Sequence, residues 1–159
     1  METIVETPEL TEYELDRDKP MPSKNHALVQ SRLVFALSLE YRHLYDFPTE
    51  ISLDTPGKGS VPDVAIYPKL TFDSFNDESK MTQMPLCAIE IISASQYEGD
   101  MVKKAARYFQ AGVKSYWLVN PIFKLVHVFS GPTTYRTFTE GTVTDAAVGI
   151  SLDMGPIFG

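Results

Sequence analysis

The chain has 159 residues, of which 43% are hydrophobic and 11% are aromatic, as is typical of one folded domain with a sizeable core. Its net charge of −7 at pH 7 is unlike that of a strongly basic nucleic-acid-binding protein, so nucleic acid contact would need a metal site or a local basic groove. The single cysteine, Cys87, excludes an internal disulfide framework and a cysteine-rich zinc site.

Neither a membrane span nor a signal peptide is expected. No apolar run approaches about 18 residues, and the first ten residues lack the basic and apolar regions of a signal sequence. We therefore expect a soluble, cytoplasmic protein with no membrane contact. Residues 1–22 are acidic and contain several prolines, which predicts an N-terminal extension with a short edge strand.

A long helix is expected over about residues 24–45, with Ser23 as its N-cap. Apolar residues form a broad stripe along it and predict that the helix is well buried. His26 and Glu40 interrupt this stripe, and each is either a satisfied core group or a site residue. They are roughly 20 Å apart at the rise of a helix, so both cannot contact one atom.

Residues 49–53 and 61–67 are predicted to form two antiparallel strands joined by a turn-rich loop. Asp63 opens the second strand. An aspartate at the start of a strand is often only a turn residue, so Asp63 alone is a weak signal. Residues 68–84 are polar and aperiodic, which predicts a loop before the next strand.

Residues 86–120 are expected to form a strand, a helix and a second strand parallel to the first. Residues 86–92 are apolar except for Glu90, which shares a face with Ala88 and Ile92. A carboxylate in such a strand is costly unless it is paired, hydrogen-bonded or bound to a cation. Glu90 is therefore the first candidate functional residue.

The helix that follows is predicted to begin at a capping box formed by Ser95 and Glu98, and to end near Gly112. Asp100, Lys104 and Tyr108 lie along one edge of it. An ordinary helix ion pair between Asp100 and Lys104 is a competing interpretation.

Further extended segments are expected over residues 124–129, 133–138 and 143–150, before an apolar tail that docks on the domain. Tyr108, Trp117 and Cys87 are interpreted as core residues, and His127 is expected to be exposed.

The predicted order is helix, strand, strand, strand, helix, strand, which gives an α/β fold with a mixed sheet. Asp63 and Glu90 then lie on neighbouring strands and can share a hard divalent cation such as Mg²⁺ or Mn²⁺. Such an ion activates water for attack on a phosphodiester. Lys104 is the candidate for stabilising the developing charge, because its helix packs back across the sheet.

Several short motifs follow one another along the chain: Met21-Pro22-Ser23 with Asn25-His26, Val61-Pro62-Asp63-Val64-Ala65, Ile89-Glu90-Ile91-Ile92-Ser93-Ala94-Ser95, Asp100-x-x-x-Lys104-x-x-x-Tyr108, Ala111-Gly112-Val113 and Tyr116-Trp117-Leu118-Val119-Asn120-Pro121. Their order and spacing resemble the PD-(D/E)XK nuclease superfamily, and in detail its Uma-type putative restriction endonuclease family. The resemblance covers residues from about 13 to 158.

The resemblance implies one restriction-endonuclease-like domain over residues 1–159, with a mixed sheet core and additional C-terminal strands. It implies Asp63 and Glu90 as metal ligands, with the main-chain carbonyl of Ile91 as a third. Glu40 would match the helix glutamate that some superfamily members add, with Glu50 as a weaker rival. Other residues with an implied supporting role are His26, Asp100, Tyr108 and Ser93.

One departure concerns the lysine of the superfamily, which normally lies two residues after the acidic residue on the same strand. That position is Ile92 here. In the family that the chain resembles, the lysine is found on the following helix, which implies Lys104 in this role.

Two functions remain open from the sequence. The first is a Mg²⁺- or Mn²⁺-dependent DNA endonuclease, which would act as a homodimer with two-fold symmetry to cut both strands. The second is a catalytically weak or inactive nuclease-fold module that binds a partner or nucleic acid in a defence or mobile-element system. The order of Asp63, Glu90 and Lys104 makes the first the leading hypothesis, and the acidic composition and the absent strand lysine motivate the second as the alternative.

Overall fold

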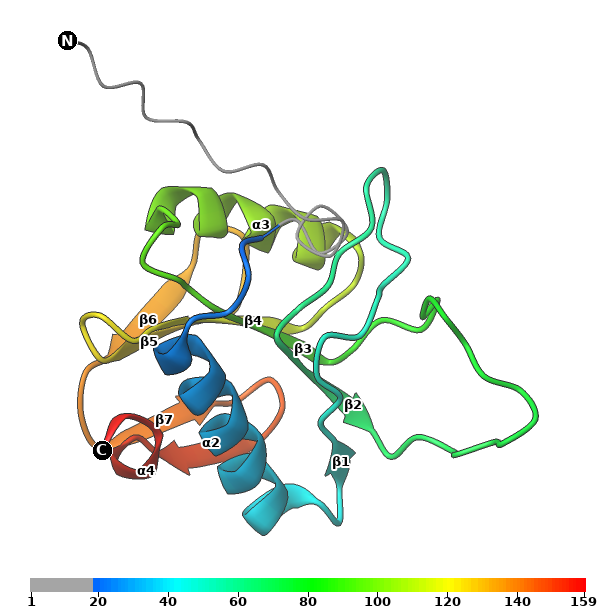
Figure 1. Cartoon of the computed structure of the whole chain (residues 1–159), viewed down its shortest axis with the longest axis horizontal. Helices are drawn as coiled ribbons and strands as arrows, with labels where there is room; N and C mark the ends of the chain where they lie inside the picture. Colours follow the sequence, from blue (N-terminus) through cyan, green and yellow to red (C-terminus); the bar gives the residue numbers. More distant parts are fainter. Residues whose placement is uncertain (1–18) are drawn as a thin grey trace, which may run out of the picture.

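A computed structural model describes residues 19–159, and the edge strand expected within residues 1–18 lies outside the described part. The chain forms a six-stranded sheet with helices on both of its faces, and a separate two-stranded sheet (Figure 1). The helices are α2 (Lys24–Tyr41), α3 (Glu98–Gln110) and α4 (Gly155–Phe158). The strands are β1 (Tyr45–Asp46), β2 (Val64–Pro68), β3 (Cys87–Ile91), β4 (Ser115–Asn120), β5 (Leu125–Phe129), β6 (Tyr135–Phe138), β7 (Thr142–Asp145) and β8 (Ile150–Asp153).

The sheet is mixed, as predicted, and its strands follow the chain in the order β1-β2-β3-β4-β5-β6. β3 and β4 are parallel and are connected by α3, so the predicted strand–helix–strand unit is confirmed. The other neighbouring strands in this sheet are antiparallel, and Val64 of β2 pairs with Ile89 of β3. The main chain before β2 is thereby brought close to the end of β3.

The strand predicted over residues 49–53 is wrong. This segment forms only isolated bridges, from Thr49 to Val64 and from Leu53 to both Ser60 and Met81. The two-residue strand β1 pairs with the far end of β2 instead. The local reason is at Glu50, whose φ of 53° lies in the left-handed region and interrupts an extended backbone. The predicted helix also ends earlier than expected, at Tyr41.

The two faces of the sheet are covered differently. α3 lies on one face, while α2, β7, β8 and α4 lie on the other (Figure 1). Alternate residues of β3 point to opposite faces: Ile89 joins the core under α2, and Ala88 joins the core under α3. The apolar tail docks as expected, because Ile157 of α4 is buried beside α2.

The prediction that α2 is well buried is wrong for much of its surface. Val29, Leu33 and Leu37 face the core, whereas Phe35 and Leu39 are 69% and 70% exposed. One face of the sheet covers only one side of this helix, so the apolar residues outside the narrow stripe remain in solvent. Ser23 does cap the helix, as predicted, by accepting a hydrogen bond from the His26 N–H.

The capping box predicted at the start of α3 does not form. The N-cap is Tyr97, and no side chain caps the helix there. Glu98 instead accepts hydrogen bonds from Asn120 and, at 2.8 Å, contacts the Nε2 atom of His127. His127 is consequently buried and not exposed as expected, while Gly112, with φ of 102°, ends the helix as predicted.

Candidate active site

The two candidate carboxylates come together at the edge where β2 begins and β3 ends. Asp63 directly precedes β2, and Glu90 is the fourth residue of β3. Both side chains are buried, with 0% and 1% of their surfaces exposed. Asp63 Oδ1 and Glu90 Oε2 each lie 2.8 Å from the same atom, the Nζ of Lys19. The carboxylates therefore converge on one cationic group.

Asp63 is fixed by contacts from β3 and α2. Its Oδ2 atom accepts a hydrogen bond from the main-chain N–H of Ile91 at 2.7 Å and lies 3.2 Å from Nε2 of His26 on α2. Its main-chain carbonyl accepts a hydrogen bond from the Gln30 side chain at 2.9 Å. His26 of α2 therefore lies next to the carboxylates and contacts Asp63 directly. Gln30, one helical turn after His26, was missed, although the spacing of four residues places both on one side of α2.

Glu90 is held by a tyrosine from the helix that covers it. The hydroxyl of Tyr108 on α3 donates a hydrogen bond to Glu90 Oε1 at 2.8 Å. The Tyr108 ring stacks on Tyr116 of β4, with 5.4 Å between the ring centroids. Burial first, and then the charge of Glu90, raise the pKa of Tyr108 well above its ordinary value, so its hydroxyl stays a donor. Tyr108 is therefore a core residue, as predicted, and its hydroxyl contacts Glu90.

Lys19 and Asp63 stabilise each other's charged forms. Burial alone would raise the pKa of Asp63, but the Lys19 ammonium and the contact with His26 keep it below its usual range. Burial alone would lower the pKa of Lys19, but the charges of Glu90 and Asp63 outweigh burial and raise it. The cluster is a buried ion pair network with a shared cation.

The contact of Lys19 with the carboxylates was not predicted from the sequence, because no motif or periodic pattern includes this lysine. It lies in the acidic, proline-containing segment before α2, where no periodicity assigns its side chain to a face. Its side chain is nevertheless only 2% exposed. A lysine near Pro20 and Pro22 in an acidic segment is a weak sequence signal of a functional site. Lys19 reaches the carboxylates only because this segment packs against the sheet.

Lys104 is not brought into contact with the carboxylates. It is half-buried on α3, and within residues 19–159 it makes no hydrogen bond or ion pair with Asp63, Glu90 or Asp100. The interpretation of Asp100 and Lys104 as a helix ion pair is therefore wrong. Asp100 is exposed, and both residues line a neighbouring cleft.

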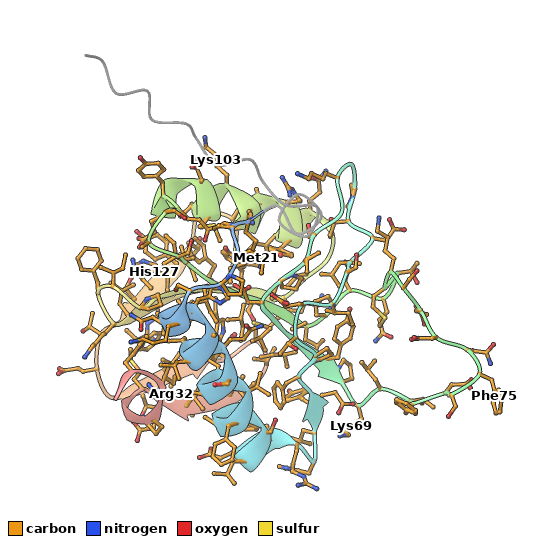
Figure 2. The ribbon with its side chains drawn as sticks, in the orientation of Figure 1. Met21, Arg32, Lys69, Phe75, Lys103 and His127 are labelled. Carbon is orange, nitrogen blue, oxygen red and sulfur yellow. The ribbon has the colours of Figure 1, made fainter. Side chains whose placement is uncertain are left out.

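That cleft has a volume of about 420 Å³ and lies between α3, the loop before it and the segment that leads into α2. Figure 2 labels Lys103 on α3 and Met21 on the segment that leads into α2. Its basic lining residues are Lys19, Lys103, Lys104 and Arg107, and Asp100 is its acidic one. We call it the cationic cleft. Although the chain is acidic as a whole, positive charge gathers beside the carboxylates.

Of the remaining residues predicted for the site, Ser93 and Glu50 lie near the two carboxylates and Glu40 does not. Ser93 is buried after β3, where its N–H and hydroxyl contact the Gln96 side chain and shape the loop that lines the cationic cleft. Glu50 lies beside Asp63, to whose carbonyl its main-chain N–H donates at 3.2 Å. Glu40 is exposed near the C-terminal end of α2, so the expectation that it joins the site is wrong.

The donor set fits a hard divalent cation. Asp63 Oδ1 and Glu90 Oε2 both lie 2.8 Å from the Lys19 ammonium. A Mg²⁺ ion in its place would need both oxygens closer, at about 2.0–2.1 Å. Within residues 19–159 no group of three or more His, Cys, Asp or Glu side chains is arranged to hold a metal. Mg²⁺ commonly uses one or two carboxylates and keeps several waters, so two carboxylates suffice. Lys19 would have to give way to such an ion.

Within the same residues, no helix is both long and apolar enough to cross a bilayer. A solved structure with a similar fold is the crystal structure of a putative nuclease from Anabaena variabilis ATCC 29413, with a TM-score of 0.75 and 20% sequence identity. The alignment covers 87% of this chain and 83% of that one, and at this identity it shows the fold alone. Among curated proteins, none matches.

The family comparison spans almost the whole chain. Residues 7–155 match the model of the family described as Uma2, putative restriction endonuclease. The match includes the segment with Lys19, both carboxylates and α3. The chain belongs to the Uma2 family of putative restriction endonucleases.

Proposed function

We propose that this protein is a Mg²⁺- or Mn²⁺-dependent DNA endonuclease. The observation that carries the proposal is the convergence of two buried carboxylates, from neighbouring strands, on one cation position. Membership of a family described as restriction endonucleases supports a nuclease as the general class. The cationic cleft supports a polyanionic substrate, because its four basic side chains lie in a chain of net negative charge.

The residues of this chain have separable tasks in that reaction. Asp63 and Glu90 would hold the metal ion, which when bound supplies charge neutralisation and lowers the pKa of water. The Ile91 N–H and His26 position Asp63, and Tyr108 positions Glu90. In the reaction, a water oxygen bonds to phosphorus as one P–O bond to a sugar breaks. The water loses a proton, and the leaving oxygen takes one up.

Lys103, Lys104 and Arg107 are assigned to the phosphate backbone. They lie on one flank of α3, at the lining of the cleft next to the carboxylates. Lysine and arginine at such a surface neutralise phosphates without reading the sequence. A homodimer with two-fold symmetry in the cytoplasm would present two such sites, one to each strand of a duplex.

The test is cleavage of supercoiled plasmid DNA with Mg²⁺ or Mn²⁺ by the wild type and by Glu90→Gln. We expect the substitution to slow cleavage by about 10²- to 10³-fold, the usual cost of removing one electrostatic group at a reacting centre. Glu140→Gln, which changes an exposed glutamate, is the matched control and should cleave like the wild type. Equal cleavage by Glu90→Gln would assign the activity to another site or to a contaminant.

A second function is a nuclease-fold binding module that works without metal. The observation that favours it is Lys19, whose ammonium already contacts both carboxylates from within the chain. Calorimetric titration with Mn²⁺ separates the two functions. Binding that disappears in Glu90→Gln supports the nuclease, whereas no binding up to about 10 mM would favour the module.

A further inference from the structure

We propose that Lys19 is the catalytic lysine of this site and competes with the divalent cation for the two carboxylates. This inference rests on the proposed function, and it assigns to Lys19 the role that sequence reasoning gave to Lys104. No residue of strand β3 can fill that role, because the position two residues after Glu90 is the apolar Ile92.

The contacts of Lys19 place it at the reacting centre. Its Nζ atom lies 2.8 Å from both Asp63 Oδ1 and Glu90 Oε2, and its side chain is 2% exposed. These two oxygens belong to the carboxylates that would hold the metal. Lys104, by contrast, is half-buried in the cationic cleft and contacts neither carboxylate within residues 19–159.

The Lys19 ammonium occupies the position that a divalent ion would need, because its Nζ atom lies 2.8 Å from one oxygen of each carboxylate. The ammonium and the ion cannot both lie between the same two oxygens, so Lys19 must release at least one carboxylate when the ion binds.

Once released, the Lys19 ammonium can interact with a substrate phosphate in the cationic cleft. Lys19 also lines the cationic cleft, together with Lys104 and Arg107. A phosphate that enters the cleft therefore meets Lys19 between the other basic residues and the carboxylates. There its N–H groups can donate to a phosphate oxygen on which charge develops, an interaction that grows in the transition state.

The test compares Lys19→Met with Lys104→Met, the matched change of a lysine in the same cleft. Three quantities are measured for each variant. They are the Mn²⁺ affinity by calorimetry, the unfolding temperature with and without Mn²⁺, and the rate of plasmid cleavage at saturating Mn²⁺. For Lys19→Met we expect affinity at least about tenfold tighter, because the internal competitor is gone, and cleavage at least about 100-fold slower. Its unfolding temperature should fall without metal and recover with it. Lys104→Met should keep its affinity and lose less than about tenfold in cleavage.

Two outcomes overturn the inference alone. One is a Lys19→Met protein that cleaves within about threefold of the wild type. The other is Mn²⁺ affinity that is unchanged or weaker in Lys19→Met, which would make Lys19 a structural support. If neither the wild type nor Lys19→Met binds Mn²⁺ or cleaves DNA, the proposed nuclease function fails together with the inference about Lys19. This result differs from the two outcomes above, in which the wild type still binds Mn²⁺ and cleaves DNA.

Lys19→Arg keeps the test decisive if Lys19→Met fails to fold. Arginine retains the positive charge, but its planar guanidinium cannot take the place of a compact ammonium between two oxygens. We expect a folded protein whose cleavage is at least about tenfold slower. Cleavage by Lys19→Arg at the wild-type rate would overturn the inference.

Discussion

The two faces of the central sheet differ in what they bury. Under α2 most of the buried core side chains are aliphatic, such as Leu33 and Ile89, and the largest is Trp117, whose indole N–H donates to Asp145. Under α3 the core contains the stacked rings of Tyr108 and Tyr116, and Glu90 points into it. Both faces are formed by alternate residues of the same strands.

This difference separates two tasks. The apolar core under α2 stabilises the fold by burying apolar surface, while the contacts of α2 with Asp63 come from its polar residues His26 and Gln30. The face under α3 stabilises the fold too, but the Tyr108 hydroxyl on it also positions the Glu90 carboxylate. Substitutions on the first face should therefore change stability alone, and those on the second should change stability and metal binding together.

The largest expected effect on stability is that of Leu33→Ala, on the face under α2. Leu33 is fully buried, and truncating it leaves a cavity, so we expect a loss of about 3 kcal/mol in the free energy of unfolding. Urea denaturation measures this loss. Mn²⁺ affinity of the folded protein should stay within about twofold of the wild type, because no ligand of the metal moves.

Leu39→Ala is the matched control on the same helix. Leu39 is 70% exposed, so we expect its truncation to change the free energy of unfolding by less than about 0.5 kcal/mol. A loss of Mn²⁺ affinity in Leu33→Ala, comparable with that of a site variant, would show that the two faces are not separable.

Tyr108→Phe, on the other face, should have a smaller effect on stability and a second effect on binding. It removes the hydroxyl that donates to Glu90 Oε1 and leaves a buried, charged acceptor without that partner. We expect a loss of about 2 kcal/mol in the free energy of unfolding, measured with urea, and a measurable weakening of Mn²⁺ affinity.

Tyr116→Phe provides the control within the same ring stack. The Tyr116 hydroxyl donates to the main-chain carbonyl of Met101 at 3.0 Å and does not contact Glu90. Its removal should cost about 1 kcal/mol, as for a neutral hydrogen bond, without a change in Mn²⁺ affinity. Equal Mn²⁺ affinities for both variants would contradict the positioning role of Tyr108.

The smallest expected effect on stability comes from the cationic cleft. Lys103→Ala and Arg107→Ala should leave the free energy of unfolding within about 0.5 kcal/mol, because both residues border solvent. DNA binding should weaken for all sequences alike, and the slope of log K against log salt should fall by about 1 for each lost phosphate contact.

Lys114→Ala is the control for the cleft. Lys114 is exposed and precedes β4, at the end of the sheet where Cys87 pairs with Ser115, away from the carboxylates. It should leave the salt slope unchanged. An equal reduction in slope would mean that DNA contacts are spread over the surface and that the cleft is not the binding site.

The sequence was sufficient for the parts of the fold that follow local rules. The apolar run around Glu90, the helix after it and Gly112 predicted the strand–helix–strand unit, because period and turn chemistry act over a few residues. Glu90 itself stood out because a charge inside a buried strand needs an explanation. Asp63 became a candidate because the predicted strands were neighbours in the sheet.

What could not be predicted depends on contacts between distant segments. Lys19 and Glu90 are 71 residues apart, and no local pattern links the segment before α2 to β3. His127 alternates with apolar residues in its strand and was expected in solvent, but Glu98 from α3 covers it. The exposure of Phe35 likewise depends on which elements pack against α2.

The central claim is that Asp63 and Glu90 bind a divalent cation at the place where Lys19 now lies. A crystal structure of the wild-type protein with Mn²⁺, with the ion located by its anomalous scattering, tests this most directly. We predict one Mn²⁺ ion bound to Asp63 Oδ1 and Glu90 Oε2, with the Lys19 ammonium moved from at least one of these oxygens toward the cationic cleft. Carboxylates still bridged by Lys19, with no Mn²⁺ between them at saturating concentration, would contradict it.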